Sequence, residues 1–272
     1  MNIFNVVLIQ PLTNGLMLFY KILGGNMGLA IIGFSIFLRF VLNPLTKPYM
    51  QSMKKMKEFE PQLAKLKKKY QGDNKKMLEA QSEFYKQKGI NPGAGCLPYL
   101  LQIIVLIALF NVFTQALSAN VNGLDKFNQL LYSPLKLEQG ASLNTRFLYM
   151  DVTKPDKFIV PGLPFPLPGP ILIFAALIQF VSAKMMAPMV KVEEKIAKKT
   201  KGAADDFQVA MQQSMTYTFP LFTIIFGLSF PSGLALYWLL FSLWQAVSQY
   251  QTSGWGGLSP IISKLGLLKS GK

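Results

Sequence analysis

Residues 28–45 read GLAIIGFSIFLRFVLNPL, an apolar run interrupted by one charged residue, Arg39. A run of this length and composition is typical of a helix that crosses a membrane. A guanidinium in the middle of a bilayer costs about 2.5–3.5 kcal/mol and stays charged, so its presence in such a helix calls for a reason. Ser35, Arg39 and Asn43 follow one another at intervals of four residues, which predicts a polar stripe along one face of this helix.

A purely structural explanation of Arg39 stays open at this point. The residue lies six positions before Leu45, about 9 Å along a helix, and an arginine side chain can reach water over roughly that distance. The rest of the sequence weakens this explanation, because none of the predicted membrane segments contains Asp, Glu or His. Arg39 therefore has no fixed counter-ion among the predicted spans.

The composition of the 272-residue chain is that of a membrane protein, with 51% hydrophobic residues, 15% charged residues and a mean hydropathy of +0.30. Long apolar runs predict five membrane-spanning helices. The fourth is 16 residues long, about 24 Å of helix against roughly 30 Å of hydrocarbon, which predicts a locally thinned bilayer. The five predicted spans are residues 27–45, 96–117, 171–189, 215–230 and 234–250.

The net charge of +15 is unevenly distributed along the chain. Residues 47–88 contain 12 Lys and 5 acidic residues, residues 184–206 contain 6 Lys and 4 acidic residues, and 3 Lys follow residue 250. Residues 118–167 are nearly neutral, with 5 basic and 4 acidic residues. The positive-inside rule places the three basic segments in the cytoplasm and the neutral one outside. With five spans, the N-terminus is expected outside and the C-terminus in the cytoplasm.

These predictions divide the chain into segments. Residues 1–25 are apolar but interrupted by Pro11, Asn14 and Gly15, which favours an external interfacial amphipathic helix, because a sixth span would invert the charge topology. No removable signal peptide is expected, since a basic start and a cleavage site are missing. The other segments are 26–45 (first transmembrane helix), 46–90 (cytoplasmic basic helical hairpin), 96–117 (second transmembrane helix), 118–167 (external segment), 168–189 (third transmembrane helix), 190–213 (cytoplasmic loop), 214–250 (fourth and fifth transmembrane helices) and 251–272 (cytoplasmic tail).

The basic hairpin has two open interpretations. Apolar residues from Met50 to Tyr70 recur at spacings of three and four, with Pro61 expected to kink the first helix. A second helix presents Met77, Gln81, Phe84 and Lys88 on one face. The hairpin is then either a solvated antiparallel coiled coil or a docking surface for anionic headgroups, ribosomal RNA or a nascent chain.

Several function classes are excluded or disfavoured. Cys96 is the only cysteine and the chain has no His, so a disulfide, a metal site and a redox cofactor are not expected. Cys96 is expected to be a small apolar residue at a helix start, with acylation as the alternative. Paired catalytic groups are missing, so we expect no catalytic residues, no cofactor and no enzyme. The main alternative is a small-anion facilitator or transporter, which the lack of intramembrane acids and of internal repeats disfavours.

Five stretches, in this order, carry a resemblance to a known family. They are FLRFVLNPL (37–45), KGINPGAGCLPYLLQIIVLIALF (88–110), FLYMDVTKPD (147–156), LIQFVSAKMMAP (177–188) and FPSGLALYWLLFSLWQAVSQYQ (230–251). Together they resemble the YidC/Oxa/Alb membrane protein insertases over nearly the whole chain. No single stretch is decisive, but the ordered set is specific.

The resemblance implies an all-α membrane protein of the cell membrane, with five helices around a hydrophilic groove, that inserts and helps to fold other membrane proteins. It places Arg39 in that groove. It also implies that newly made membrane proteins are the clients, with the SecY translocon and the ribosome as candidate partners and no specific nucleic-acid site. The short N-terminal region resembles the short form of the family. The full set of candidate groove residues is Ser35, Arg39, Asn43, Gln102, Gln179 and Trp244.

Some of these assignments have equal alternatives. Gln102 and Gln179 could serve as hydrogen-bonding residues between helices rather than as groove lining. Trp244 could equally belong to the packed interior. Ser242 stands where many relatives have Asn, which leaves the hydrogen bonding of the fifth span open.

Overall fold

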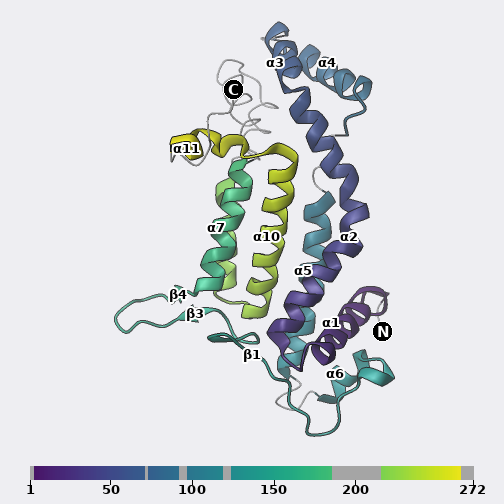
Figure 1. Cartoon of the computed structure of the whole chain (residues 1–272), viewed down its shortest axis with the longest axis vertical. Coiled ribbons are helices and arrows are strands. Elements are labelled where there is room, and N and C mark those ends of the chain that lie inside the picture. Colours follow the sequence, from purple (N-terminus) through teal and green to yellow (C-terminus); the bar gives the residue numbers. More distant parts are fainter. Residues whose placement is uncertain (1–2, 71–72, 92–96, 119–123, 186–215, 265–272) are drawn as a thin grey trace. The chain divides into compact units, whose positions relative to one another are not determined.

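A computed structural model describes residues 3–70, 73–91, 97–118, 124–185 and 216–264 of the chain. The described part is mostly helical, and each of its strands has only two residues (Figure 1). The predicted cytoplasmic loop 190–213 and Cys96 lie outside the described residues. The helices are η1 (Asn5–Ile9), α1 (Gln10–Ile22), α2 (Met27–Glu58), α3 (Glu60–Lys69), α4 (Asn74–Gln87), α5 (Leu97–Ser118), α6 (Leu124–Leu130), η4 (Ser133–Leu135), α7 (Pro170–Met185), a helix at Thr216–Gly227, α10 (Ser232–Ser253), η5 (Gly256–Leu258) and α11 (Ser259–Lys264).

The chain divides into two compact units. The first, called the arginine unit here, consists of residues 1–42, 99–176 and 222–241. The second, called the hairpin unit, consists of residues 43–98, 177–221 and 242–272.

A single apolar core holds the arginine unit together. It is built from α1, the first half of α2, α5, α6, and the beginnings of α7 and α10, with buried side chains such as Leu16, Met27, Leu172 and Leu234. Small residues allow α1 and α2 to approach closely. A Cβ added at Gly15 would lie 2.4 Å from the ring of Phe34, so α1 can pack on α2 only where this side chain is absent.

The N-terminal helix also differs in detail from the prediction. Pro11 and Asn14, which we expected to interrupt it, both lie within α1. Pro11 is in the first turn of α1, where a missing N–H has little cost. Asn14 is buried, and its side chain donates to the carbonyl of Leu130 (2.8 Å) and accepts from the amide of Tyr132 (2.7 Å). The polar residue therefore ties α1 to the segment that follows α6.

Two short antiparallel pairs shape the segment between α6 and α7. Strand β1 (Arg146–Phe147) pairs with β2 (Met150–Asp151), and β3 (Lys157–Phe158) pairs with β4 (Leu167–Pro168). Gly162 has φ 90° in the loop between β3 and β4, a conformation that glycine adopts without strain.

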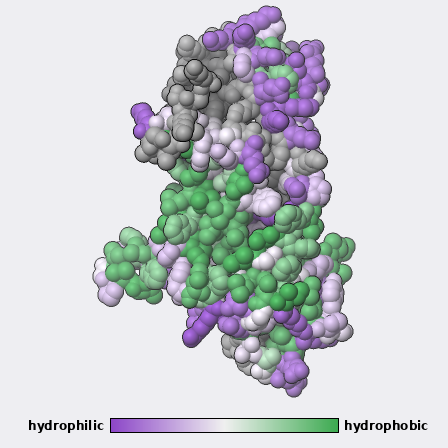
Figure 2. All heavy atoms as spheres, viewed as in Figure 1, coloured by the Kyte–Doolittle hydropathy of each residue, from purple (hydrophilic) through white to green (hydrophobic). Residues whose placement is uncertain are grey.

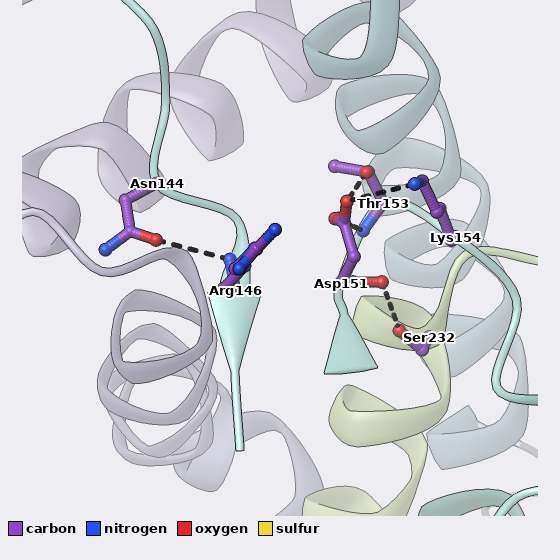
Figure 3. A network of polar contacts seen from close by, with 6 residues as sticks. All are labelled: Asn144, Arg146, Asp151, Thr153, Lys154 and Ser232. Carbon is purple, nitrogen blue, oxygen red and sulfur yellow. Dashed lines mark hydrogen bonds and ion pairs between the residues drawn. The ribbon is translucent and has the colours of Figure 1, made fainter. Parts of the chain in front are cut away.

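The segment that contains β1 and β2 is fastened to its neighbours by polar contacts (Figure 3). Ser232 at the start of α10 donates its hydroxyl to the Asp151 carbonyl (2.9 Å) and its amide to the Lys154 carbonyl (2.7 Å). The amide of Met27 donates to the carbonyl of Asn144 (3.0 Å). The segment therefore joins the starts of α2 and α10 through backbone groups that helix termini leave without internal partners.

The hairpin unit contains α3 and α4. Phe59 and Phe84 meet edge to face with ring centroids 6.2 Å apart, and Lys88 lies over the Phe59 ring at 4.8 Å. Asp73 caps α4 by accepting from the amide of Lys76 (3.1 Å), which holds the pKa of its exposed carboxyl below the usual value. The hairpin thus has a small aromatic core, and a side chain caps the start of its second helix.

Two boundaries near the hairpin differ from the prediction. Helix α2 continues from Met27 to Glu58 although Pro44 and Pro48 lie inside it. These prolines are four residues apart, so both missing hydrogen bonds fall on one face and the other faces keep the helix continuous. The break occurs at Phe59 instead of a kink at Pro61, which takes a place in the first turn of α3.

Among the described residues, few helical stretches have the length and hydropathy needed to cross a membrane. Within the described ranges, one helical stretch, Met27–Thr46, is long and apolar enough, and three shorter apolar stretches accompany it. These are Gln102–Val112, Pro170–Met185 and Thr216–Gly227.

Candidate functional site

Arg39 lies in the arginine unit, where it stacks on an aromatic ring of another helix. Its Cζ atom is 3.9 Å from the centroid of the Phe241 ring on α10. Phe241 is itself buried. A guanidinium over an aromatic face is attracted by the negative face of the ring, more strongly where water is excluded. This contact fixes the position of the charge without neutralising it.

A tyrosine and a glutamine extend this arrangement to a third helix. The Tyr237 hydroxyl contacts the Arg39 guanidinium and donates to Oε1 of Gln102 at 3.1 Å. Tyr237 is one turn before Phe241 on α10, and Gln102 comes from α5. Both side chains are almost fully buried, with exposed fractions of 3% and 5%. We call Arg39, Gln102, Tyr237 and Phe241 the arginine cluster.

The arginine cluster contains side-chain N–H groups that have no acceptor in the part of the chain that the structure describes. Nη2 of Arg39 and Nε2 of Gln102 are buried and have no hydrogen-bond partner among the described residues. No carboxylate of the described part of the chain forms an ion pair with Arg39. Buried donors of this kind are costly unless something accepts from them. The cluster is therefore chemically suited to a transient acceptor, and its charge favours an anionic one.

The other predicted site residues have different environments. Ser35 is buried, but its hydroxyl donates to the Ile31 carbonyl at 2.5 Å within its own helix. Asn43, Gln179 and Trp244 belong to the hairpin unit. Of these, Asn43 is exposed, Gln179 is buried and Trp244 is half-buried. Among the six predicted residues, the structure brings Arg39 and Gln102 together, with Tyr237 between them.

Sequence reasoning missed Tyr237 and Phe241. Both lie in LALYWLLFSLW, where a polar aromatic residue precedes an apolar one by four positions and so shares its helix face. That spacing was the available indication. It does not reveal which neighbouring helix the face meets.

A second polar cluster, in the segment before α7, has structural contacts only. The buried carboxylate of Asp156 accepts from the Tyr149 hydroxyl (2.9 Å) and from the amide of Leu172 (2.9 Å). Burial raises the pKa of Tyr149 to about 12; the hydrogen bond from the Ile171 amide opposes this shift, while the hydrogen bond to Asp156 and its charge add to it. Asp156 therefore caps the start of α7, although it lies 16 residues before Leu172 in the chain.

The carboxyl of Asp151 shows the opposite shift. Burial alone would raise its pKa, but hydrogen bonds from Thr153 and the nearby Lys154 charge outweigh burial and lower it. The Thr153 hydroxyl lies 2.6 Å from the Asp151 carboxylate (Figure 3). The residue therefore stays ionised at neutral pH and stabilises the local turn.

No metal centre is evident in the residues that the structure describes, where no group of three or more His, Cys, Asp or Glu side chains could hold an ion. The candidate site is the arginine cluster, whose charge comes from the Arg39 guanidinium.

Comparison with known proteins gives one consistent answer. Residues 18–255 match the family model described as 60Kd inner membrane protein. The chain is 30% identical over 226 residues to a protein of Fusobacterium nucleatum named membrane protein insertase YidC, a match that covers 83% of this chain and 85% of that protein. Proteins of the same name from Pelobacter propionicus and Shewanella pealeana are 34% and 32% identical, over 86% and 84% of this chain. The matches span only 36% and 33% of those two longer proteins.

Proposed function

Because this chain belongs to the YidC/Oxa/Alb family of membrane protein insertases, we propose that it draws clients into the cell membrane by means of the Arg39 charge. Its clients are newly made membrane proteins, which it inserts and helps to fold, alone or beside the SecY translocon. The arrangement that supports this best is the arginine cluster, with its half-buried guanidinium held in place and its buried Nη2 atom without an acceptor among the described residues.

The proposed topology has five membrane-spanning helices: α2, α5, α7, the helix at Thr216–Gly227, and α10. The N-terminus is outside and the C-terminus in the cytoplasm, because the basic segments follow the apolar parts of α2 and α7 and the tail is basic. The fourth span, residues 215–230 of the sequence, has 16 residues, about 24 Å of helix. A span shorter than the roughly 30 Å hydrocarbon layer thins the bilayer around it. Thinning lowers the barrier for moving polar client groups across.

Arg39 acts in this proposal as a temporary partner for acidic residues near the translocated end of a client. Phe241 and Tyr237 hold the guanidinium at one position, so little side-chain ordering is left to occur when a carboxylate arrives. Electrostatic attraction is stronger in the low dielectric of a membrane-embedded site than in water. We place this site in a hydrophilic groove, to which Ser35, Asn43, Gln102, Gln179 and Trp244 are assigned as lining residues.

The remaining energy for insertion comes from the client. Burial of its apolar residues in lipid contributes about 25 cal/mol per Å², so no nucleotide or covalent step is required. The basic hairpin, with α3 and α4, is assigned to docking of the client or of the ribosome on the cytoplasmic side. The Lys residues on its surface suit an anionic partner.

Reconstitution tests this proposal directly. The purified chain is placed in liposomes and a small single-span client with a short acidic translocated end is added; insertion is scored by protease protection. We expect insertion above that of empty liposomes, an approximately tenfold loss with Arg39→Ala, and substantial recovery with Arg39→Lys, because close charge pairs at interfaces couple by more than about 1.5 kcal/mol.

Arg146→Ala is the matched control, because Arg146 is the other arginine of the chain and is exposed on β1. It should insert clients as the unmodified protein does. Equal activity in Arg39→Ala and the unmodified protein would contradict the role of the charge. Anion flux in client-free liposomes without any client insertion would instead support the facilitator.

A further inference from the structure

The loop between β3 and β4 is an apolar hairpin whose side chains point away from the core of the arginine unit. Ile159 is 81% exposed and Phe165 59% exposed, and neither belongs to the buried core. Contiguous exposed apolar surface of this kind marks a site of contact with another apolar phase. The exposed apolar residues are Phe158, Ile159, Val160, Leu163, Phe165 and Leu167.

The backbone of this hairpin is unusually compatible with a water-poor environment. Prolines occupy positions 161, 164, 166 and 168, and a proline has no N–H that needs a partner. The Leu163 amide donates to the Val160 carbonyl (3.2 Å), and the β3–β4 pairing joins Phe158 with Leu167. Few donors therefore remain to be solvated, although the carbonyls between the strands still need water or headgroups. Such a backbone fits the boundary between headgroups and acyl chains rather than the hydrocarbon centre.

The charged residues lie at the base of the hairpin, and the rest of the hairpin has none. Lys154 and Lys157 lie at its base, and residues 158–183 contain no Asp, Glu, Lys or Arg. This charge-free stretch runs without interruption into α7, where Ile173 and Phe174 are also exposed. Figure 2 shows the hairpin as a mostly apolar projection at the left of the view. Its apolar surface is thus continuous in sequence with the exposed apolar face of α7.

The hairpin is also fixed relative to the beginning of α7. Asp156, directly before β3, accepts from the amide of Leu172, and its carbonyl accepts from the amide of Gly169 (2.8 Å). A Cβ added at Gly169 would collide with the Asp156 carboxylate. These contacts hold the base of the hairpin at the N-terminal end of α7, where a spanning helix would meet the membrane surface.

We propose that the β3–β4 hairpin is a membrane anchor, whose apolar side chains enter the lipid leaflet around the first turns of α7. The occupant of this surface is lipid, since the hairpin continues the apolar face of a helix in a membrane protein. Interfacial elements of this kind are buried about 5–10 Å into the boundary between headgroups and acyl chains. The inference rests on α7 being a span, and it does not depend on the role of Arg39.

Fluorescence quenching by brominated lipid tests the anchor. Cys96→Ser removes the only cysteine, after which Leu163→Cys in the full chain carries an environment-sensitive dye. The protein is reconstituted, one copy per nanodisc, in phosphatidylcholine and phosphatidylglycerol with bromine near the headgroup or near the chain end. The matched control is Gln139→Cys, an exposed polar position beside the Gly140 turn of the same segment.

We expect the dye at position 163 to be blue-shifted and to lose about half of its intensity, most strongly with bromine near the headgroup, as for other interfacial elements. The dye at position 139 should show neither change. Emission and quenching at position 163 equal to those at position 139 would overturn the proposal, and so would a blue shift without lipid quenching, which would mean a protein contact. Ile159→Cys provides a second, independent label on the hairpin. Client insertion by the same labelled proteins reports separately on the proposed function.

Discussion

Asp156 offers a quantitative test of how the segment before α7 is held. We consider Asp156→Asn, which keeps the size and shape of the side chain and removes its charge. The carboxylate is 2% exposed and accepts from the Tyr149 hydroxyl and the Leu172 amide, each at 2.9 Å. In asparagine one of the two terminal atoms is a donor, so one of these two partners loses its acceptor.

The expected loss follows from the two hydrogen bonds and the helix terminus. A hydrogen bond to a charged group contributes about 1.5–3 kcal/mol and one between neutral groups about 0.5–1.5 kcal/mol. The bond that is lost therefore costs about 1.5–3 kcal/mol and the bond that becomes neutral about 1–1.5 kcal/mol, about 2.5–4.5 kcal/mol together. Negative charge near the N-terminus of α7 adds about 0.3–1 kcal/mol. Asp156→Asn should therefore lower the free energy of unfolding by about 3–5 kcal/mol.

Denaturant titration in detergent micelles, followed by tryptophan fluorescence, measures this loss. The matched control is Asp125→Asn, which makes the same chemical change at an exposed position in the first turn of α6 and should cost at most about 1 kcal/mol. If the Asp156 variant stays within about 0.5 kcal/mol of the unmodified protein, the buried carboxylate does not stabilise α7 and the reasoning is wrong.

Three further predictions concern the two polar clusters. The folded protein favours the neutral form of Tyr149, whose pKa is about 12 against the ordinary value of 10.0, so its contribution to stability should be complete below pH 10 and be lost as the pH rises toward 12. A pH series of denaturant titrations on Tyr149→Phe should therefore lack this part of the decline in stability, and an identical decline would refute the prediction. Gly169→Ala should destabilise the protein by about 1–3 kcal/mol in the same titration, because the added Cβ meets the Asp156 carboxylate, and unchanged stability would contradict the close approach. Tyr237→Phe, which leaves Oε1 of Gln102 without its donor, should cost about 1–3 kcal/mol and slow client insertion in liposomes; an insertion rate equal to that of the unmodified protein would argue against a positioning role.

Much of the helical architecture could be predicted from hydrophobic runs, because a long apolar segment leaves the backbone few alternatives to a helix. The apolar run around Arg39 lies within α2, and the run that begins at residue 234 lies within α10. The ends of the helices were harder to predict. Proline usually ends a helix, yet α2 passes Pro44 and Pro48 and breaks at Phe59, because two prolines on one face leave the hydrogen bonds of the other faces intact.

The candidate site was only partly predictable, for a different reason. The unusual cost of an intramembrane charge pointed to Arg39 from sequence alone. Its partners Tyr237 and Phe241 lie about 200 residues away in the chain, and helical periodicity shows which residues share a face but not which faces meet. The same limit applies to Asp156, which caps α7 from a turn between two short strands. No periodic pattern in the sequence predicts this turn.

The central claim is that the Arg39 charge pairs with acidic residues of the client. A double-mutant cycle measures this most directly, with Arg39→Ala in the insertase and Asp→Asn in the translocated end of the client, and insertion rates determined for all four combinations. The account predicts that Arg39→Ala slows insertion about tenfold for the acidic client, a coupling of about 1.4 kcal/mol, and has little effect for the amide client. An equal slowing for both clients would show that Arg39 acts without sensing the client's charge, and would contradict the account.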